Sequence, residues 1–307
     1  MSSICIINNY NYARYIGECI ESALQQVHPF DKILIVDDGS TDDSSQIIEA
    51  YVKDNPKIEV VYKNNKGQLS CFNVAREYIA DEDLVFFLDS DDVFPPDYVQ
   101  QIMQQRLNHP ADFYFCEPTQ FQSPRSPLTT CQSGITDQDF TWEISTHTTR
   151  AIGIWVGSAT SCLVVTGALY RRIFPYTPEH EWRTRADDLV VFGAGILGAS
   201  KRYLPSLTIG YRVHQSNAFH GRRFSEAYEI RRLLEIERYF NTATTLNFLS
   251  LDKKLLEPGM LREIALVPAR LRQRFQLPTN EELALKRSRG LSRLVRKIKI
   301  AVRGPRP

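Results

Sequence analysis

Four short apolar runs alternate with segments of helical periodicity in the first hundred residues. The runs read as buried strands and cover Ile4–Ile7, Lys32–Val36, Glu59–Tyr62 and Leu84–Leu88. Between them, residues 15–26, 43–53 and 70–78 carry apolar side chains at helical spacing. Because strict alternation of strands and helices requires a parallel sheet covered on both faces, we predict an α/β fold. Ligands of such sheets bind beyond the carboxyl ends of the strands.

Polar residues follow these strands at their carboxyl ends. Asp37 and Asp38 follow the second strand, and Asp89, Asp91 and Asp92 follow the fourth. Crowded carboxylates raise one another's pKa unless a cation or hydrogen-bond donors hold them. A hard divalent ion such as Mg²⁺ or Mn²⁺ suits such a group and leaves positions for phosphate oxygens. Either cluster alone fits a turn or a helix cap equally well, but the two together favour a metal and phosphate site.

The order of these motifs resembles that of family 2 glycosyltransferases. The resemblance rests on Asn8–Asn11, Val36–Asp42, Lys66–Gln68, and Phe87–Asp92 with Pro96–Asp97 downstream. It is dense over the first hundred residues and looser over residues 155–220. One departure is that Asn8-Asn9 stands where the family usually has Pro-Thr. The resemblance implies a GT-A fold, with a mostly parallel central sheet, helices on both faces and a C-terminal helical extension. It also implies a hexosyltransferase that uses a nucleotide diphosphate sugar.

The resemblance further implies roles for individual residues of the donor half. Asp38 would hold the nucleotide base with Asn8 nearby, and Asp89 would approach the ribose. Asp91 and His214 would bind Mn²⁺ or Mg²⁺. The full set of expected nucleotide-sugar contacts is Asn8, Tyr10, Asp38, Gly67, Asp89, Ser90 and Arg212. UDP is expected as the most frequent nucleotide of the family, although no single residue indicates it.

The acceptor half of the family carries a catalytic carboxylate that deprotonates the acceptor hydroxyl in inverting members. Residues 185–191 occupy the corresponding place and offer Asp187 and Asp188. We favour Asp187 as the base and keep Asp188 as the alternative. Acids that favour a helix N-terminus would produce the same pattern. Residues 211–217 resemble a Tyr-Arg-x-His-x-x-Asn segment of the family, which gives Arg212 and His214 their implied roles.

We predict a GT-A domain over residues 1–220, with a nucleotide-binding half (1–100) and an acceptor half (101–220). Residues 118–149 have weak periodicity and are expected to be irregular. Residues 221–307 are expected to form a helical extension. Although the whole chain has a net charge of +1, residues 261–307 hold 13 Lys or Arg and 3 Asp or Glu. Residues 286–307 form a basic amphipathic tail that fits an anionic membrane surface or a mere solubility tail.

The compartment and the partners follow from composition and from what the chain lacks. The six cysteines form no CxxC pair and are expected to be core thiols. The N-terminus does not resemble a signal peptide, and no run has the roughly 18–20 apolar residues of a membrane-spanning helix. We expect a cytoplasmic protein, with a peripheral place at the inner face of the plasma membrane left open. The resemblance to family 2 glycosyltransferases implies an acceptor that is a saccharide or a lipid-linked molecule of envelope polysaccharide assembly. A homo-oligomer is left open, and no nucleic-acid partner is expected because the tail lacks interleaved aromatic residues.

Three alternative functions are weighed against the sequence. A dinucleotide oxidoreductase needs G-x-G-x-x-G after the first strand, where this chain has Asn-Tyr-Asn-Tyr. A sugar nucleotidyltransferase shares the sheet and the carboxylates but usually has a Gly-rich basic loop at that point. A catalytically inactive glycan-binding or nucleotide-binding relative also stays open, because a fold does not guarantee its chemistry.

Overall fold

A central mixed sheet organises the chain, which is described here from a computed structural model. The structure describes residues 1–122, 126, 128–177, 179–215, 217, 224–246 and 253–279. Within these residues the strands form one sheet in the order β3-β2-β1-β4-β7-β5-β8-β6. The strands are β1 (Ser3–Asn9), β2 (Lys32–Asp37), β3 (Ile58–Tyr62), β4 (Leu84–Asp89), β5 (Phe113–Phe121), β6 (Phe140–Trp142), β7 (Leu163–Thr166) and β8 (Lys201–Arg212).

The four N-terminal strands are parallel to one another, as the sequence pattern predicts. Beyond β4 the sheet is mixed: β7 runs antiparallel to β4 and β5, β8 runs parallel to β5, and β6 closes the edge antiparallel to β8. The α-helices are α1 (Ala13–Leu24), α2 (Ser44–Asp54), α3 (Gln68–Ala75), α4 (Tyr98–Asn108), α5 (Thr146–Ile152), α6 (Gly167–Ile173), α7 (Asp187–Ile196), α8 (Glu226–Leu246), α9 (Lys253–Leu266) and α10 (Ala269–Arg274).

Helices cover both faces of the sheet, which confirms the α/β prediction. Successive strand residues point to opposite faces, so Ile4 and Ile6 of β1 join one apolar cluster while Cys5 and Ile7 join the other. Helices α1, α2 and α4 pack into the second cluster, and α3, α6 and α7 pack into the first. All six cysteines are buried free thiols, as expected of core residues.

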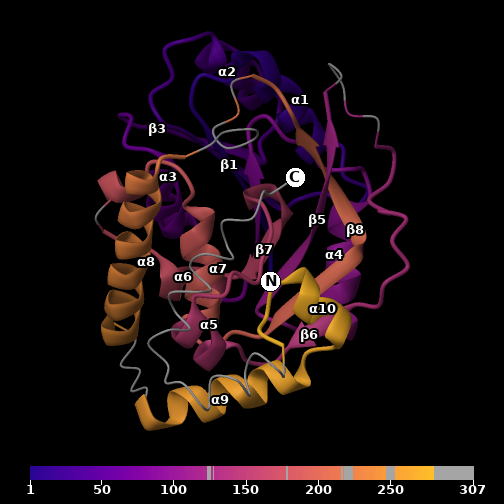
Figure 1. Cartoon of the computed structure of the whole chain (residues 1–307). Coiled ribbons are helices and arrows are strands. Elements are labelled where there is room, and N and C mark those ends of the chain that lie inside the picture. The colour runs from indigo at the N-terminus through magenta and orange to yellow at the C-terminus, as the bar shows by residue number, and fades with distance from the viewer. Residues whose placement is uncertain are drawn as a thin grey trace.

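The C-terminal helices pack onto the acceptor half of the sheet domain. Figure 1 shows α8 along one side of the molecule, next to α7, and α9 across its base, next to α5. Tyr239 of α8, Met260 of α9 and Leu271 of α10 enter the same apolar cluster as the first face of the sheet. The predicted helical extension is therefore present, while the boundary at residue 220 stays a prediction. None of the described helices combines the length and the apolar character needed to cross a bilayer.

Two sequence expectations concern residues 118–149 and residues 286–307. Residues 118–149 were expected to be irregular, yet they contain the end of β5, the short strand β6 and the start of α5. The pairing of β5 with β8 is non-local and includes a register shift between Phe115 and Glu117, so no local periodicity reveals it. The basic tail, residues 286–307, lies outside the described residues.

Candidate active site

The polar clusters meet at one edge of the sheet because β2 and β4 both flank β1. In the parallel registers, Asn8 lies opposite Asp89 of β4, and Asn9 lies opposite Asp37 of β2. The carboxyl ends of the three strands therefore present both acidic clusters side by side, as the sequence predicts. The two clusters are neighbours across β1 and do not lie on directly adjacent strands.

Asp37 fixes the turn that follows β2. Its carboxylate accepts hydrogen bonds from the Asn9 side chain (2.7 Å), from the Ser40 hydroxyl (2.6 Å) and from the Ser40 backbone N–H (2.9 Å). The side chain is buried, and its oxygens are already used by this turn. Asp37 is therefore a structural residue of the turn.

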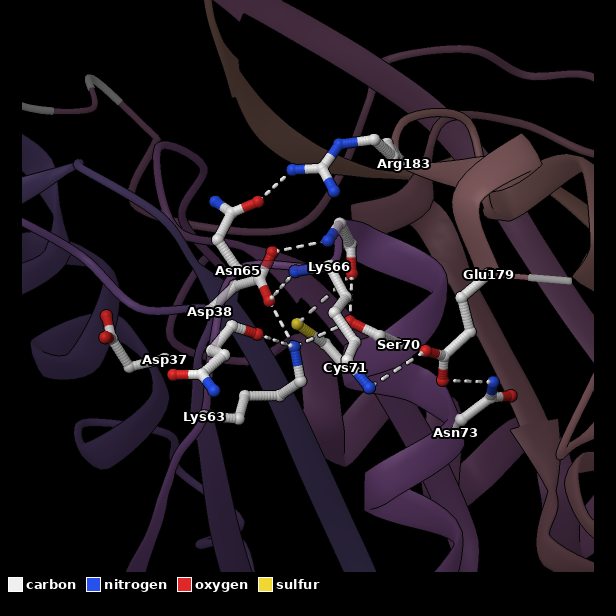
Figure 2. A network of polar contacts seen from close by, with 12 residues as sticks. Asp37, Asp38, Lys63, Asn65, Lys66, Ser70, Cys71, Asn73, Glu179 and Arg183 are labelled. Atoms are coloured by element: carbon white, nitrogen blue, oxygen red, sulfur yellow. Dashed lines mark hydrogen bonds and ion pairs between the residues drawn. The ribbon is translucent and has the colours of Figure 1, made fainter. Parts of the chain in front are cut away.

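Asp38 ties the turn to the loop before α3, as Figure 2 shows. It forms an ion pair with Lys63 and accepts hydrogen bonds from the backbone N–H groups of Lys66 (2.9 Å) and Gly67 (2.6 Å). Lys63 also donates to the Ser70 hydroxyl at 2.7 Å. Asp38 is only 3% exposed. Its contact with a nucleotide base stays a prediction, and its visible role is to shape the loop at residues 63–67.

Asn8 lies near the carboxyl end of β1, and Tyr10 directly follows this strand. The Asn8 side chain stabilises the charged form of Asp89 by a hydrogen bond, while its own Oδ1 atom is buried without a partner among the described residues. Tyr10 is exposed, with 44% of its surface accessible. A buried acceptor beside an exposed aromatic ring is a suitable arrangement for a polar ligand with a flat face.

The D-x-D segment after β4 is crowded with negative charge. Burial, with repulsion from Asp91 as a second cause, raises the pKa of Asp89 to about 7. The same causes raise the pKa of Asp92 well above its usual range. Asp92 accepts hydrogen bonds from the Ser161 hydroxyl (2.6 Å) and from the backbone N–H of Arg212 (2.9 Å), so it holds the segment in place. Ser90 is buried between the two acids of the motif.

Asp91 and His214, the two predicted metal ligands, are neighbours. The Nε2 atom of His214 lies 2.9 Å from Oδ2 of Asp91, and the Asn217 side chain donates to the same oxygen at 3.2 Å. The His214 ring packs against the ring of Tyr15, with centroids 4.7 Å apart. Among the described residues no group of three or more acidic, His or Cys side chains forms a metal cluster. The metal role of the pair stays a prediction.

Arg212 lies beneath this site, where it is only 2% exposed. Its Nε donates to the backbone carbonyl of Asp91 at 2.8 Å, and its Nη2 lies 2.5 Å from Glu18. The guanidinium also packs against the rings of Tyr15 and Phe121. These contacts help to hold the D-x-D segment in place, and the contact of Arg212 with the donor stays a prediction.

The acids at the start of α7 differ in their surroundings. Asp188 is 1% exposed and forms ion pairs with Arg232 (2.6 Å) and Arg185 (3.2 Å). Asp187 is partly exposed and takes part in no ion pair with a described residue. Burial and repulsion from Asp188 raise the pKa of Asp187 to about 6, against the opposing effect of Arg185 and Arg232. Of the two candidates, Asp187 is the one that is partly exposed, and its role as the general base stays a prediction.

Two residues of the site, Gln68 and Arg232, were given no role from the sequence. Gln68 lies between the donor and acceptor halves: it donates to Asp89 at 3.1 Å and accepts from the backbone N–H of Ala186 at 2.9 Å. Its position beside Gly67 in a family-like stretch was the one available signal. Arg232 comes from α8, far away in the sequence, and no local pattern connects it with Asp188.

Known proteins resemble this chain in sequence and in fold. The model of glycosyl transferase family 2 matches residues 4–174. An uncharacterized glycosyltransferase of Nostoc sp. is 32% identical over 213 residues, which cover 69% of this chain and 65% of that protein. The chain thus spans less than two thirds of this relative's length.

Two solved structures have the same fold at low sequence identity. TarS of S. aureus, residues 1–349 in complex with UDP-GlcNAc, has a TM-score of 0.59 at 20% identity, covering 99% of this chain and 92% of that one. The mannosyltransferase PcManGT of Pyrobaculum calidifontis, in complex with GDP-Man and Mn²⁺, has a TM-score of 0.55 at 18% identity, covering 98% and 80%. Because the family model matches more than half of its residues, the chain belongs to glycosyl transferase family 2.

Proposed function

We propose that the protein transfers a hexose from a nucleotide diphosphate sugar, expected to be a UDP-sugar, to a hydroxyl of a saccharide or lipid-linked acceptor. The observation that carries this proposal is that Asp187, at the start of α7, lies near Asp89 at the carboxyl end of β4. Asp187 is near enough to Asp89 to raise its pKa, and Gln68 contacts both Asp89 and the residue before Asp187. The family membership supports the same reaction.

In the proposed reaction, Asp187 accepts the proton of the acceptor hydroxyl. The hydroxyl oxygen forms a bond to the anomeric carbon from the side opposite the diphosphate, and the bond to the diphosphate oxygen breaks with its electron pair. Attack from the opposite side inverts the configuration of the sugar. A carboxylate with a pKa of about 6 suits this task, because it is deprotonated at neutral pH yet more basic than an ordinary Asp.

The residues at the D-x-D segment fit a divalent ion. Asp91 and His214 offer an oxygen and a nitrogen that already converge, and each side chain is only about a tenth exposed. Such an ion neutralises charge that develops on the leaving diphosphate. We assign Asp91 and His214 to hold Mn²⁺ or Mg²⁺, with the remaining positions left to donor oxygens and water. Mn²⁺ in the complex of PcManGT supports this assignment.

The remaining donor contacts are assigned to the edge formed by β1, β2 and the loop before α3. Asn8 offers its unpartnered buried oxygen, Tyr10 its exposed ring, and Gly67 a close approach of backbone at φ +93°. Asp89 and Ser90 would contact the ribose and the diphosphate of the donor. We keep Asp38 as a contact of the nucleotide base in this proposal, although its carboxylate also binds Lys63 and two backbone N–H groups of the protein.

A thermal-shift panel followed by a turnover assay tests the proposal. UDP, GDP, dTDP and CMP are each added with and without Mn²⁺, and nucleotide release is then measured from the matching sugar donors. A metal-dependent shift, followed by nucleotide release that Asp187→Asn strongly slows, supports a glycosyltransferase. A shift without release would favour an inactive binding relative, and release of pyrophosphate from a nucleoside triphosphate would favour a nucleotidyltransferase.

The basic residues of 286–307 support a second part of the proposal, contact with an anionic membrane surface. Nine basic residues and no acidic one stand in this segment. Removal of residues 289–307 should abolish co-sedimentation with anionic vesicles and leave donor hydrolysis intact. Unchanged vesicle binding by the shortened protein would contradict this role.

A further inference from the structure

The side chain of Gln68 binds both Asp89, at the end of β4, and the backbone of Ala186, at the start of α7. Its Nε2 donates to Oδ1 of Asp89 at 3.1 Å, and its Oε1 accepts from the backbone N–H of Ala186 at 2.9 Å. A further contact at 3.4 Å joins Nε2 to the Thr160 hydroxyl. An amide can donate and accept at the same time, whereas an ionised carboxylate can only accept. Glutamine therefore matches both partners, and its length spans the gap between them.

The backbone around Gln68 is fixed from both sides. Its own N–H donates to the carbonyl of Arg183 at 2.9 Å. The preceding Gly67 touches the same segment so closely that a Cβ there would lie 2.2 Å from the Cα of Arg183. Asp38 holds the N–H of Gly67 from the opposite side. The Gln68 side chain thus starts from a rigid point.

Ala186 is the residue directly before Asp187 at the start of α7. The first N–H groups of a helix have no partner within the helix, so Gln68 satisfies one of them. Holding this N–H fixes the backbone from which the Asp187 side chain extends. Displacements near 1 Å at a reacting group can lower rates by about a hundredfold.

We propose that Gln68 is a positioning residue, which sets the place of Asp187 relative to Asp89 and so aligns the base with the donor. This inference rests on the proposed function. Gln68 does not need to touch the reacting atoms, because it acts through the Ala186 backbone and the Asp89 carboxylate. Loss of its side chain should therefore lower kcat more than it raises the KM for the donor.

Asn73 of α3 provides a matched control on the same segment. Its side chain donates to the carbonyl of Tyr176 (2.9 Å) and to Glu179 (3.0 Å), and it accepts from the N–H of Tyr176 (2.9 Å). Figure 2 shows Asn73 beside Glu179. Asn73 thus tethers the loop before α7 without reaching Asp89 or Ala186. Removing its bonds reports the effect of a looser loop alone.

The test compares Gln68→Met, Gln68→Glu and Asn73→Leu with the wild-type protein, using the nucleotide sugar that the wild type turns over. Gln68→Met has a similar shape but no hydrogen bonds, so we expect kcat to fall tenfold or more and the donor KM to change less than threefold. Gln68→Glu keeps an acceptor for Ala186 and places a second charge beside Asp89. It should regain part of kcat and raise the donor KM. Wild-type kcat in Gln68→Met, or an equal loss of kcat in Asn73→Leu, would overturn the proposal.

Hydrogen exchange gives a readout that does not depend on turnover. In Gln68→Met the amides of residues 183–188 should exchange faster than in the wild type, whereas Asn73→Leu should accelerate exchange over residues 174–180. Unchanged exchange at 183–188 in Gln68→Met would also refute the positioning role. A wild-type protein that turns over no nucleotide sugar would refute the proposed function, while the exchange result still decides the role of Gln68. If Gln68→Met does not fold, Gln68→Asn, which is one methylene too short to span both partners, takes its place.

Discussion

The Nη2 atom of Arg232 lies 2.6 Å from Oδ2 of Asp188, and both side chains are almost completely buried. The guanidinium also stacks on the ring of Trp182, with its carbon 3.7 Å from the ring centroid. This pair connects α8 to the first turn of α7. The ion pair with Arg232 gives Asp188 a structural role. The adjacent Asp187 forms no ion pair with a described residue.

Replacing Arg232 with Met should destabilise the protein strongly. The change leaves Asp188 buried with Arg185 as its remaining cation, and breaking a buried pair in this way typically costs about 3–5 kcal/mol. Urea unfolding followed by circular dichroism measures the effect. Arg231→Met, at the exposed neighbouring position, is the matched control and should change stability by less than about 0.5 kcal/mol. Equal stability of the two variants would show that the buried pair does not anchor α8.

The rate of transfer should depend on pH through Asp187. Its pKa is raised to about 6 by burial and by Asp188, and the base must be deprotonated to accept a proton. Therefore kcat with saturating donor should fall as the pH drops through 6, about tenfold for each unit below it, whereas kcat/KM also reflects Asp89, whose pKa is raised to about 7. Asp187→Asn should lower kcat by about 10²–10⁴ and remove this acidic limb from the residual rate. An unchanged profile in Asp187→Asn would mean that another group is the base.

Local pattern was enough to predict the donor half of the molecule. The strands of β1 to β4 are short apolar runs that end in polar residues, and parallel pairing brings those ends together without further information. The sequence therefore predicted that the polar strand ends converge, while the pairing of Asn8 with Asp89 is seen only in the structure. The prediction that Asp91 and His214 lie close together rested on the resemblance of residues 211–217 to a segment of the family.

The acceptor half depended on contacts between distant segments. Asp187 and Asp188 are equivalent in sequence, and only the arrival of Arg232 from α8 distinguishes them. Arg212, the last residue of β8, binds the backbone carbonyl of Asp91 and pairs with Glu18, contacts that no local pattern indicates, while its contact with the donor stays a prediction. Gln68 illustrates the same limit, because both of its partners lie elsewhere in the chain.

Metal-dependent nucleotide binding should require Asp91. In the wild type, a nucleoside diphosphate at a hundredfold excess over its Kd should add about 2.7 kcal/mol of stability in the presence of Mn²⁺. Asp91→Asn removes a charged ligand and should abolish the Mn²⁺-dependent part of this gain, as measured by thermal shift. His214→Gln should reduce it to a smaller extent. If Asp91→Asn keeps the full Mn²⁺-dependent gain, the ion is bound elsewhere.

Asp38→Asn separates the observed role of Asp38 from the expected one. The carboxylate binds Lys63 and two backbone N–H groups, so its loss should destabilise the free protein by about 1–3 kcal/mol in urea unfolding, even without nucleotide. A double-mutant cycle with Lys63→Met should show that the two effects are not additive, because the residues share one interaction. If free Asp38→Asn is as stable as the wild type but has lost its nucleotide affinity, Asp38 would act only as a contact of the nucleotide base. Loss of both would mean that the residue shapes the loop and contacts the donor, since the loop at 63–67 and the Gln68 side chain that follows it rest on the same carboxylate.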